Sequence, residues 1–300
     1  MAERGSLKHR SRRRRADRRW AALAVLLAAM TCMAGAAADV REGAVVTLRS
    51  GGMTIELQRA HGWAIQHLSY RGVAIATRAG AFGAVACVPV AGGWVGSAHT
   101  EGGVERVDEV SLTVDGEPAV LEDGAEYTGE RLVLQKRSML DKLRLDATLT
   151  LDGGVLAERH DLTATEDVVV TVVYPFMYPI TSETTSWLAV TADGEEIGGE
   201  FGIGGDLQWH DDWTWTSAFI PGRSTGVVVR HLAMPEGAQT LTGYWDQERY
   251  HKLYARWVGE MEPWPEGRTL SGEVALRCFE APSQGWREMA RQVASELVAE

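Results

Sequence analysis

One stretch of the sequence decides the fold class: residues 143–162 read LRLDATLTLDGGVLAERHDL. From Leu143 to Leu151, Leu or Ala alternates with a charged residue or Thr. A period of two predicts a β-strand with one face buried and the other in water. The residues Asp152-Gly153-Gly154 then turn the chain, and the alternation resumes from Val155 to Leu162. The stretch therefore predicts an antiparallel pair of strands.

Further strands are predicted on both sides of this pair. They are residues 45–48, 54–57, 63–68, 73–75, 168–173, 227–229 and 274–276. Gly51-Gly52 is a hairpin-type turn between the first two, and Arg71-Gly72 turns the chain before the fourth. The run 168–173 is β-branched throughout, which is typical of a strand buried on both faces.

One helix is predicted near the end of the chain. It begins at Pro282-Ser283, with Ser283 as the N-cap. Its apolar stripe consists of Trp286, Met289, Ala290, Val293, Ala294 and Leu297, which recur at steps of three and four. We expect this helix to pack on the outside of the sheets and close the fold.

Composition excludes several classes of protein. The 300 residues are 45% hydrophobic and 24% charged, which is too apolar for a disordered chain. Three Cys exclude a disulfide-rich miniprotein and a Cys-rich zinc scaffold. Asp and Glu number 41 against 30 Lys and Arg, and the net charge of -11 argues against a general nucleic-acid binder.

Residues 1–38 have the order of regions found in a secretory signal. A basic segment runs to Arg19, an apolar stretch follows from Trp20 to Met33, and small residues lead to Ala38. The apolar stretch is shorter than the roughly 20 residues that span a bilayer. We therefore expect cleavage after Ala38, a secreted or periplasmic location, and no stable membrane span afterwards; an uncleaved signal anchor is the alternative.

Residues 39–300 suit one large β domain. The leader carries nine Lys and Arg against two Asp and Glu, a net charge of +7, which leaves -18 on residues 39–300. Two cysteines remain in that part, Cys87 and Cys278. They form one disulfide or act as two buried small hydrophobic residues, and the sequence leaves both alternatives open.

The predicted fold class is mainly β: a large antiparallel β-sandwich with one C-terminal helix. The opening hairpins lead into Gly80-Ala81-Phe82-Gly83, and the later alternation ends in Glu158-Arg159-His160. This succession resembles the galactose-mutarotase-like supersandwich, a superfamily of aldose epimerases and of sandwich domains in glycoside hydrolases and polysaccharide lyases. The resemblance implies a carbohydrate ligand. The family's Asn-Arg and His-Pro substrate-binding signatures are not in place, so no epimerase residue roles carry over.

A glycine-rich segment holds the first candidate site. It runs from Trp94 through His99 and Glu101 to Glu105. Gly residues let a loop approach a ligand closely, and a His with a carboxylate can serve as general acid and base. The alternative is a solvated surface loop. His99 and Glu101 are candidate catalytic residues, and Trp94 is a candidate sugar-binding residue.

The segment Trp209–Trp215 holds the second candidate site. On a strand, Trp213 and Trp215 share a face, and their rings offer a platform on which sugars stack. The alternative is a Trp-rich edge of the core.

The segment Tyr244–Trp257 is the densest run of functional side chains. The candidate catalytic residues in it are Tyr250, His251 and Lys252, and the candidate substrate-binding residues are Tyr244, Trp245, Arg249 and Arg256. On a strand, Tyr250 and Lys252 share one face and His251 lies on the other. A base and a cation together suit proton removal beside a sugar carboxylate. The alternative is an amphipathic strand whose Lys and Arg extend to solvent.

The segment Tyr174–Pro179 is the last candidate. Two Pro residues end the preceding strand, which places Tyr174 at the mouth of a pocket or in an aromatic plug between sheets. The remaining histidines are interpreted as structural; they are His61, His67, His160 and His231.

Two functions follow as hypotheses. The first is a secreted carbohydrate-active enzyme, epimerase-like or polysaccharide-lyase-like, that uses acid/base chemistry on a sugar or uronate. The second is a non-catalytic sugar-binding or structural envelope protein. No nucleophile elbow, P-loop or dinucleotide fingerprint occurs, and neither a cofactor nor a metal is predicted.

Overall fold

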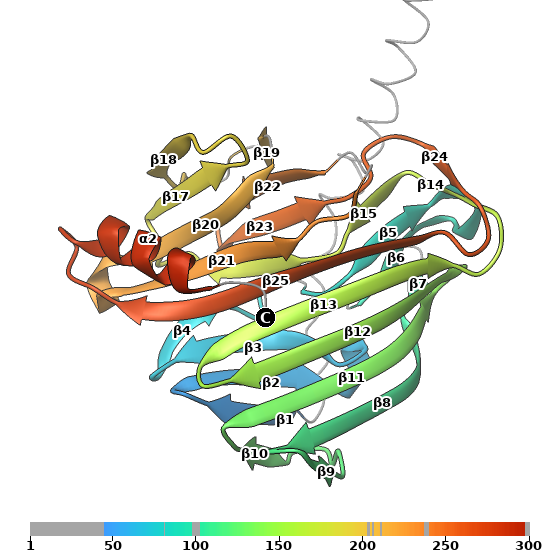
Figure 1. Cartoon of the computed structure of the whole chain (residues 1–300), viewed down its shortest axis with the longest axis horizontal. Helices are drawn as coiled ribbons and strands as arrows, with labels where there is room; N and C mark the ends of the chain where they lie inside the picture. The colour runs from blue at the N-terminus through green and yellow to red at the C-terminus, as the bar shows by residue number, and fades with distance from the viewer. Residues whose placement is uncertain are drawn as a thin grey trace, which may run out of the picture. The chain divides into compact units, whose positions relative to one another are not determined.

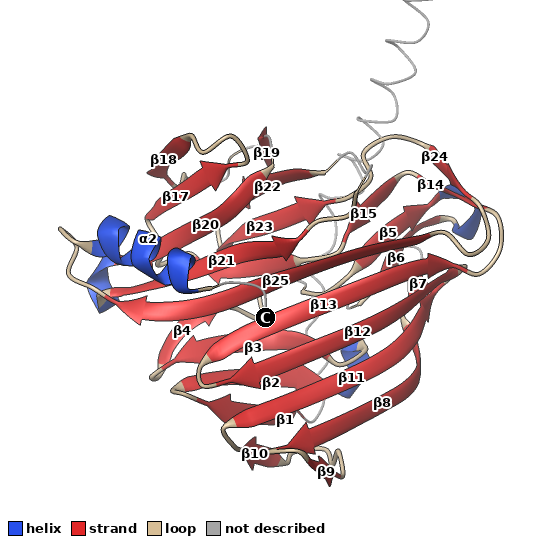
Figure 2. Ribbon diagram, viewed as in Figure 1, coloured by secondary structure: helices blue, strands red, loops and turns tan. Residues whose placement is uncertain are grey.

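Two large β-sheets account for most of the described structure (Figures 1 and 2). The computed structural model describes residues 45–80, 82–97, 103–202, 205, 207–210, 212–236 and 240–297. Within these residues, the first sheet has nine strands in the spatial order β10 (Glu126–Thr128), β1 (Val45–Ser50), β2 (Met53–Gln58), β3 (Ala64–Tyr70), β4 (Val73–Ala76), β16 (Met177–Thr181), β23 (Tyr250–Arg256), β22 (Leu241–Asp246) and β19 (Leu207–His210).

The second sheet has ten strands within the same described ranges. Their spatial order is β18 (Glu196–Glu200), β17 (Ser186–Thr191), β20 (Trp213–Ile220), β21 (Thr225–Ala233), β25 (Thr269–Glu280), β13 (Val155–Ala164), β12 (Leu143–Asp152), β11 (Arg131–Leu140), β8 (Arg106–Val114) and β9 (Glu117–Ala119). Nearly all neighbours are antiparallel, whereas β1 and β10 run parallel. This confirms the predicted mainly β class.

Shorter elements complete the described chain. One small sheet joins β15 (Val172–Tyr174), β5 (Val85–Val88), β6 (Gly93–Gly96) and β7 (Gly103–Val104), and another joins β14 (Val168–Val170) to β24 (Glu262–Trp264). Single 3-10 turns occur at η1 (Arg59–His61), η2 (Pro89–Ala91) and η3 (Pro221–Arg223). The α-helix of the described residues is α2 (Trp286–Glu296).

The stretch that decided the fold class forms the hairpin of β12 and β13. Side chains along β12 alternate strictly between buried and half-buried. The pairing runs without a register shift from Leu143 opposite Ala164 to Asp152 opposite Val155. Gly153 and Gly154 both have positive φ, at 54° and 88°, a conformation that other L-residues rarely adopt. The alternation and its turn are both confirmed.

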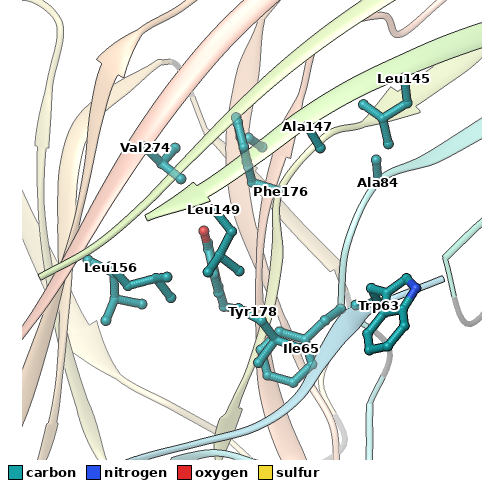
Figure 3. Close-up of a cluster of buried hydrophobic side chains, with 14 of the residues drawn as sticks. Trp63, Ile65, Ala84, Leu145, Ala147, Leu149, Leu156, Phe176, Tyr178 and Val274 are labelled. Atoms are coloured by element: carbon teal, nitrogen blue, oxygen red, sulfur yellow. The ribbon is translucent and has the colours of Figure 1, made fainter. Parts of the chain in front are cut away.

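The core fills the space between the two large sheets. Leu48 of β1 and Ile55 of β2 belong to the same buried cluster as Leu134 of β11 and Leu151 of β12. Figure 3 shows side chains from strands far apart in the sequence meeting in this core, with Ile65 and Leu149 among those labelled. Fully burying one such aliphatic side chain contributes about 1.5–3 kcal/mol.

Helix α2 covers part of the ten-stranded sheet, as expected. Trp286, Ala290 and Val293 are buried in a second cluster with side chains of β20, β21 and β25. Figure 1 shows the helix lying against these strands. The predicted N-cap is wrong: Gly285 occupies that position and the helix starts at Trp286, because a turn closed by Gly285 N–H and the Pro282 carbonyl leaves Ser283 outside the helix.

The run 168–173 is not one strand buried on both faces. The chain forms β14 and then β15, which pair with β24 and β5 in two different small sheets. Thr171 lies between them, and its backbone N–H donates to the Cys87 carbonyl. Val169 and Val172 are only half-buried, so a continuous β-branched run does not by itself mark a central strand.

Cys87 and Cys278 do not form a disulfide with each other. Cys278 is buried on β25, and burial raises the pKa of its thiol. Cys87 is half-buried on β5. Of the two alternatives left open by the sequence, the disulfide between Cys87 and Cys278 is thus not formed.

The predicted leader, residues 1–38, lies outside the described residues and stays a prediction. Within the described part of the chain, no helix is both long and apolar enough to cross a membrane.

Candidate functional site

Strand β23 carries the densest run of predicted site residues, and its neighbours fix where each side chain points. It pairs with β16 on one side and with β22 on the other, without a register shift. Successive side chains of a strand point to opposite faces, so the even-numbered residues from Tyr250 to Arg256 share one face. His251 lies on the other face, as the sequence predicted.

Rings and cations gather on the even-numbered face, in a group that we name the aromatic–cationic cluster. Its members are Trp94, Tyr174, Trp245, Lys252, Tyr254 and Arg256, from β6, β15, β22 and β23. Trp94 stacks on Tyr174 with ring centroids 5.5 Å apart and planes 13° apart. Tyr174 meets Tyr254 edge to face at 5.1 Å. The tertiary structure thus brings together six side chains from three separate segments of the sequence, five of them predicted site residues.

The chemistry of the cluster follows from its burial. The ammonium of Lys252, a residue only 5% exposed, lies 5.2 Å from the centroid of the Tyr254 ring. Burial raises the pKa of Tyr174 to about 12 and that of Tyr254 well above its ordinary value. Both phenols are therefore protonated at neutral pH and can donate hydrogen bonds. Burial lowers the pKa of Arg256, but a guanidinium stays charged near neutral pH.

The members of the cluster differ in their exposure. Trp94 and Trp245 are half-buried, whereas Tyr174, Lys252 and Tyr254 are buried. Among the aromatic members of the cluster, the two indoles are thus the more exposed.

Tyr250 is the first residue of β23, and its ring lies close to the backbone of Gly80. A Cβ atom at Gly80 would lie 2.6 Å from Cβ of Pro179 and 3.2 Å from Cζ of Tyr250, so a larger residue there would displace one of them. Burial raises the pKa of Tyr250. Arg249, in the turn just before β23, is exposed.

The opposite face of the β22–β23 hairpin carries a buried Asp–His pair. His251 Nδ1 lies 2.9 Å from Asp246 Oδ1. Asp246 Oδ2 accepts the backbone N–H of Gly202 at 2.7 Å, and Phe201 stacks on the imidazole at 4.3 Å. The pair therefore pins the segment after β18 onto the hairpin. It places His251 on the face opposite Lys252.

Tyr244 lies on this second face as well. Its ring is 5.1 Å from Trp187 and 5.4 Å from Phe201. Its neighbour Trp245 points into the aromatic–cationic cluster. Tyr244 and Trp245, which the sequence predicted as parts of one site, thus lie on opposite faces of the sheet.

The two tryptophans of β20 do not form the exposed platform that their spacing predicted. Trp213 is 2% exposed and stacks on Trp187 at 5.5 Å. Trp215 is 8% exposed and packs in the cluster beneath α2. Neither ring is open to a sugar.

A β-bulge explains why these rings also fail to share a face. Thr191 pairs with Trp213, but its neighbour Val190 pairs with Trp215, so β20 has one extra residue at this point. Adjacent residues of β17 point to opposite faces, and their partners on β20 must do the same. The i, i+2 rule applied to the sequence is wrong here because the register shifts.

The predicted catalytic residues His99 and Glu101 lie outside the described residues. The chain on both sides of them is anchored by a buried carboxylate. Glu105 accepts hydrogen bonds from Ser97 and, at 2.5 Å, from Ser138, and it forms a 2.6 Å ion pair with Lys136. The Glu105 side chain is fully buried.

A second polar group, which is not among the predicted site residues, lies inside the sandwich. Tyr178 donates a 2.7 Å hydrogen bond to Glu158, whose pKa is raised by burial. His160 stacks on Phe176 at 4.7 Å, and burial lowers its pKa to about 3. The signal was present: Glu158 and His160 alternate in phase with the buried leucines of β13.

This interior group borders a small cavity. Lys136, Glu158 and His160 line it together with apolar side chains, and its volume is about 30 Å³. That space fits a water molecule or two but no sugar ring. In the described part of the chain, no group of three or more His, Cys, Asp or Glu side chains is arranged to hold a metal ion.

Comparison with known proteins gives likeness of fold. No family model matches the chain, and no curated protein matches it in sequence. Among solved structures, galactose 1-epimerase from Lactobacillus acidophilus is 10% identical, with a TM-score of 0.50 over 78% of this chain and 93% of that one.

The galactosidase domain of the α-galactosidase–sucrose kinase AgaSK is also 10% identical, with a TM-score of 0.52 over 79% of this chain. This chain spans only 40% of that protein's length. Such low identity carries no residue roles. What the likeness establishes, together with the sheet order and the packing, is the architecture: this chain has the galactose mutarotase-like fold.

Proposed function

We propose that the protein binds a carbohydrate on the aromatic–cationic cluster. The observation that carries the proposal is the position of Trp94 and Trp245, two half-buried indoles that pack in one cluster with buried phenols and the buried Lys252. The C–H faces of a sugar stack on aromatic rings, while its hydroxyls need a few fixed polar partners behind. The fold shared with a galactose 1-epimerase supports the same class of ligand.

Binding is favoured over base catalysis by the protonation of the phenols. A general base near neutral pH needs a pKa close to 7. Burial instead moves the pKa values of Tyr174, Tyr250 and Tyr254 upwards. These groups are donors at neutral pH. Catalysis remains the second candidate function, supported by Tyr250 and Lys252 sharing one face of β23.

Isothermal titration calorimetry against neutral and acidic mono- to trisaccharides tests the proposal. We expect at least one ligand to bind, and Trp94→Ala and Trp245→Ala each to weaken it about tenfold, since one aromatic contact contributes roughly 0.5–1.5 kcal/mol beyond its buried area. Trp286→Phe on α2, far from the cluster in the packing, is the control.

Failure of every sugar to bind, or equal affinities in the two Trp→Ala variants and the wild type, would refute the proposed site. NMR spectra of the same mixtures report any change of anomer or release of product. Turnover that is lost in Lys252→Met would establish the catalytic alternative.

A further inference from the structure

We infer that the aromatic–cationic cluster selects an acidic sugar, a uronate, and that Lys252 determines this specificity by binding its carboxylate. The inference rests on the proposed function and narrows it to one class of ligand.

The first argument is the position of the Lys252 ammonium. Lys252 lies in the middle of β23, between Pro179 of β16 and Trp245 of β22, and is only 5% exposed. Removing an ammonium from water costs several kcal/mol unless other groups compensate. The Tyr254 ring 5.2 Å away supplies part of that compensation. A cation kept inside a ring-lined site is well placed to recognise a ligand of opposite charge.

The second argument is the kind of hydrogen bond that the cluster offers. Its described polar groups are an ammonium, a guanidinium, two phenols and two indoles. Ammonium, guanidinium and indole groups only donate, and the phenols of Tyr174 and Tyr254 keep their protons at neutral pH. A carboxylate is the complementary ligand, because its two oxygens only accept. Neutral sugar hydroxyls, in contrast, donate as well as accept.

The third argument is the presence of a second cation. Arg256 lies four residues after Lys252, on the same face of β23, and acts electrostatically on Tyr174 across the cluster. A guanidinium binds a carboxylate through two parallel hydrogen bonds, and such charge-assisted bonds are about twice as strong as neutral ones. Two cations on one wall therefore favour an anionic ring over its neutral counterpart.

The net charge of the whole protein limits the length of an acidic oligosaccharide that can serve as a probe. The net charge of -11 repels a long polyanion, whereas a short one is governed by the groups that it touches. The probes are therefore trisaccharides of galacturonate, mannuronate and guluronate, each paired with its methyl ester. Esterification removes the charge and leaves the ring and its linkage unchanged.

Calorimetry on the intact protein compares each acid with its ester. We expect one acid to bind at least tenfold more tightly than its ester. Lys252→Met keeps a chain of similar length and removes the charge, and it should weaken binding of the acid by about 10- to 100-fold, as for a lost charged hydrogen bond. Binding of the ester should change less than about threefold. Lys142→Met, at the exposed turn between β11 and β12, is the matched control.

Each outcome bears on a different statement. An ester that binds as tightly as its acid overturns the inference but leaves the proposed sugar site standing. A preference that survives in Lys252→Met overturns the role of Lys252. If no acid and no neutral sugar binds, the proposed function falls together with the inference. If circular dichroism shows that Lys252→Met is unfolded, Arg256→Gln takes its place, and the comparison of acid and ester on the wild type is unaffected.

Discussion

The buried imidazole of His160 is expected to make the protein sensitive to acid. The ring stacks on Phe176 and donates a hydrogen bond to the Pro175 carbonyl. Nδ1 has no hydrogen-bond partner among the described residues, so the donating atom is Nε2 and the neutral ring is the form that fits. Burial is the largest cause of its low pKa, and the nearby Lys136 charge adds to it.

The size of the effect follows from linkage between protonation and folding. The pKa of His160 is about 3 in the folded protein, against an ordinary value of 6.5. Between these values the unfolded chain holds a proton that the folded protein does not, so stability falls as the pH is lowered. One pKa unit corresponds to about 1.4 kcal/mol, which gives a loss of roughly 2.5–3 kcal/mol at pH 4.5 and about 4.4 kcal/mol near pH 3. Well above pH 6.5 the imidazole is neutral in both states and His160 contributes nothing to the slope.

Urea unfolding of the wild type and of His160→Gln, at several pH values from 7.5 to 4.5, measures this contribution. The variant should be less stable at pH 7.5, by about 1–2 kcal/mol for the lost stacking and hydrogen bond. Its free energy of unfolding should then fall less steeply, so that the difference from the wild type shrinks or reverses by pH 4.5.

Other titrating groups cancel in this comparison. Glu158 acts in the opposite sense, because its raised pKa gives stability that is present below its ordinary value of 4.5 and lost as the pH rises. It is present in both proteins. His61→Gln, at a half-buried histidine bonded to Gln66, is the control and should keep the wild-type slope. Parallel curves for the wild type and His160→Gln would refute the assignment.

Two further variants test the polar groups that hold the site. Glu105→Gln leaves the Lys136 ammonium buried without its carboxylate and should lower the free energy of unfolding by about 3–5 kcal/mol, with part of the loss recovered in Glu105→Gln/Lys136→Met. A loss below about 1 kcal/mol in urea melts would contradict the burial of that pair. Asp246→Asn weakens the hydrogen bonds to His251 and to the Gly202 amide, at a cost of about 1.5–3 kcal/mol. The backbone amide of Gly202 should therefore exchange its hydrogen faster. An unchanged exchange rate would contradict the role of Asp246 in holding the segment after β18 onto the hairpin.

The strands that could be predicted are those with one face against the core and the other face in water. Along β12 and β13 one face contacts the core and the other contacts water, so burial imposes a period of two on the sequence. The same pattern would have identified Glu158 and His160 as inward-facing, had their polarity not suggested otherwise. The prediction for residues 168–173 was wrong because a run of β-branched residues has no alternation that shows which face is buried, and nothing in it marks the break between β14 and β15.

The aromatic–cationic cluster was predicted in part. Strand periodicity correctly placed Tyr250 and Lys252 together on one face of β23. It placed His251 on the opposite face. It did not reveal that Tyr174 would meet Tyr254, because that contact joins strands of two different sheets, β15 and β23, that are about 80 residues apart in the sequence. Nor did it reveal the bulge in β20, since a bulge arises from pairing with β17 and leaves no local signature.

The sequence by itself determined the mainly β class, the turns, the C-terminal helix and the likeness to the mutarotase fold, because these follow from local periodicity and from residues such as Gly153 that tolerate a positive φ. The tertiary structure alone decided which aromatic residues are accessible and which are core. Trp94 and Trp213 carry the same side chain, and their neighbours in sequence do not predict the outcome, because Trp94 is flanked by Gly93 and Val95 and Trp213 by Asp212 and Thr214. One is half-buried beside Lys252 and Tyr254, and the other is enclosed against Trp187, because burial depends on which strands the chain brings together.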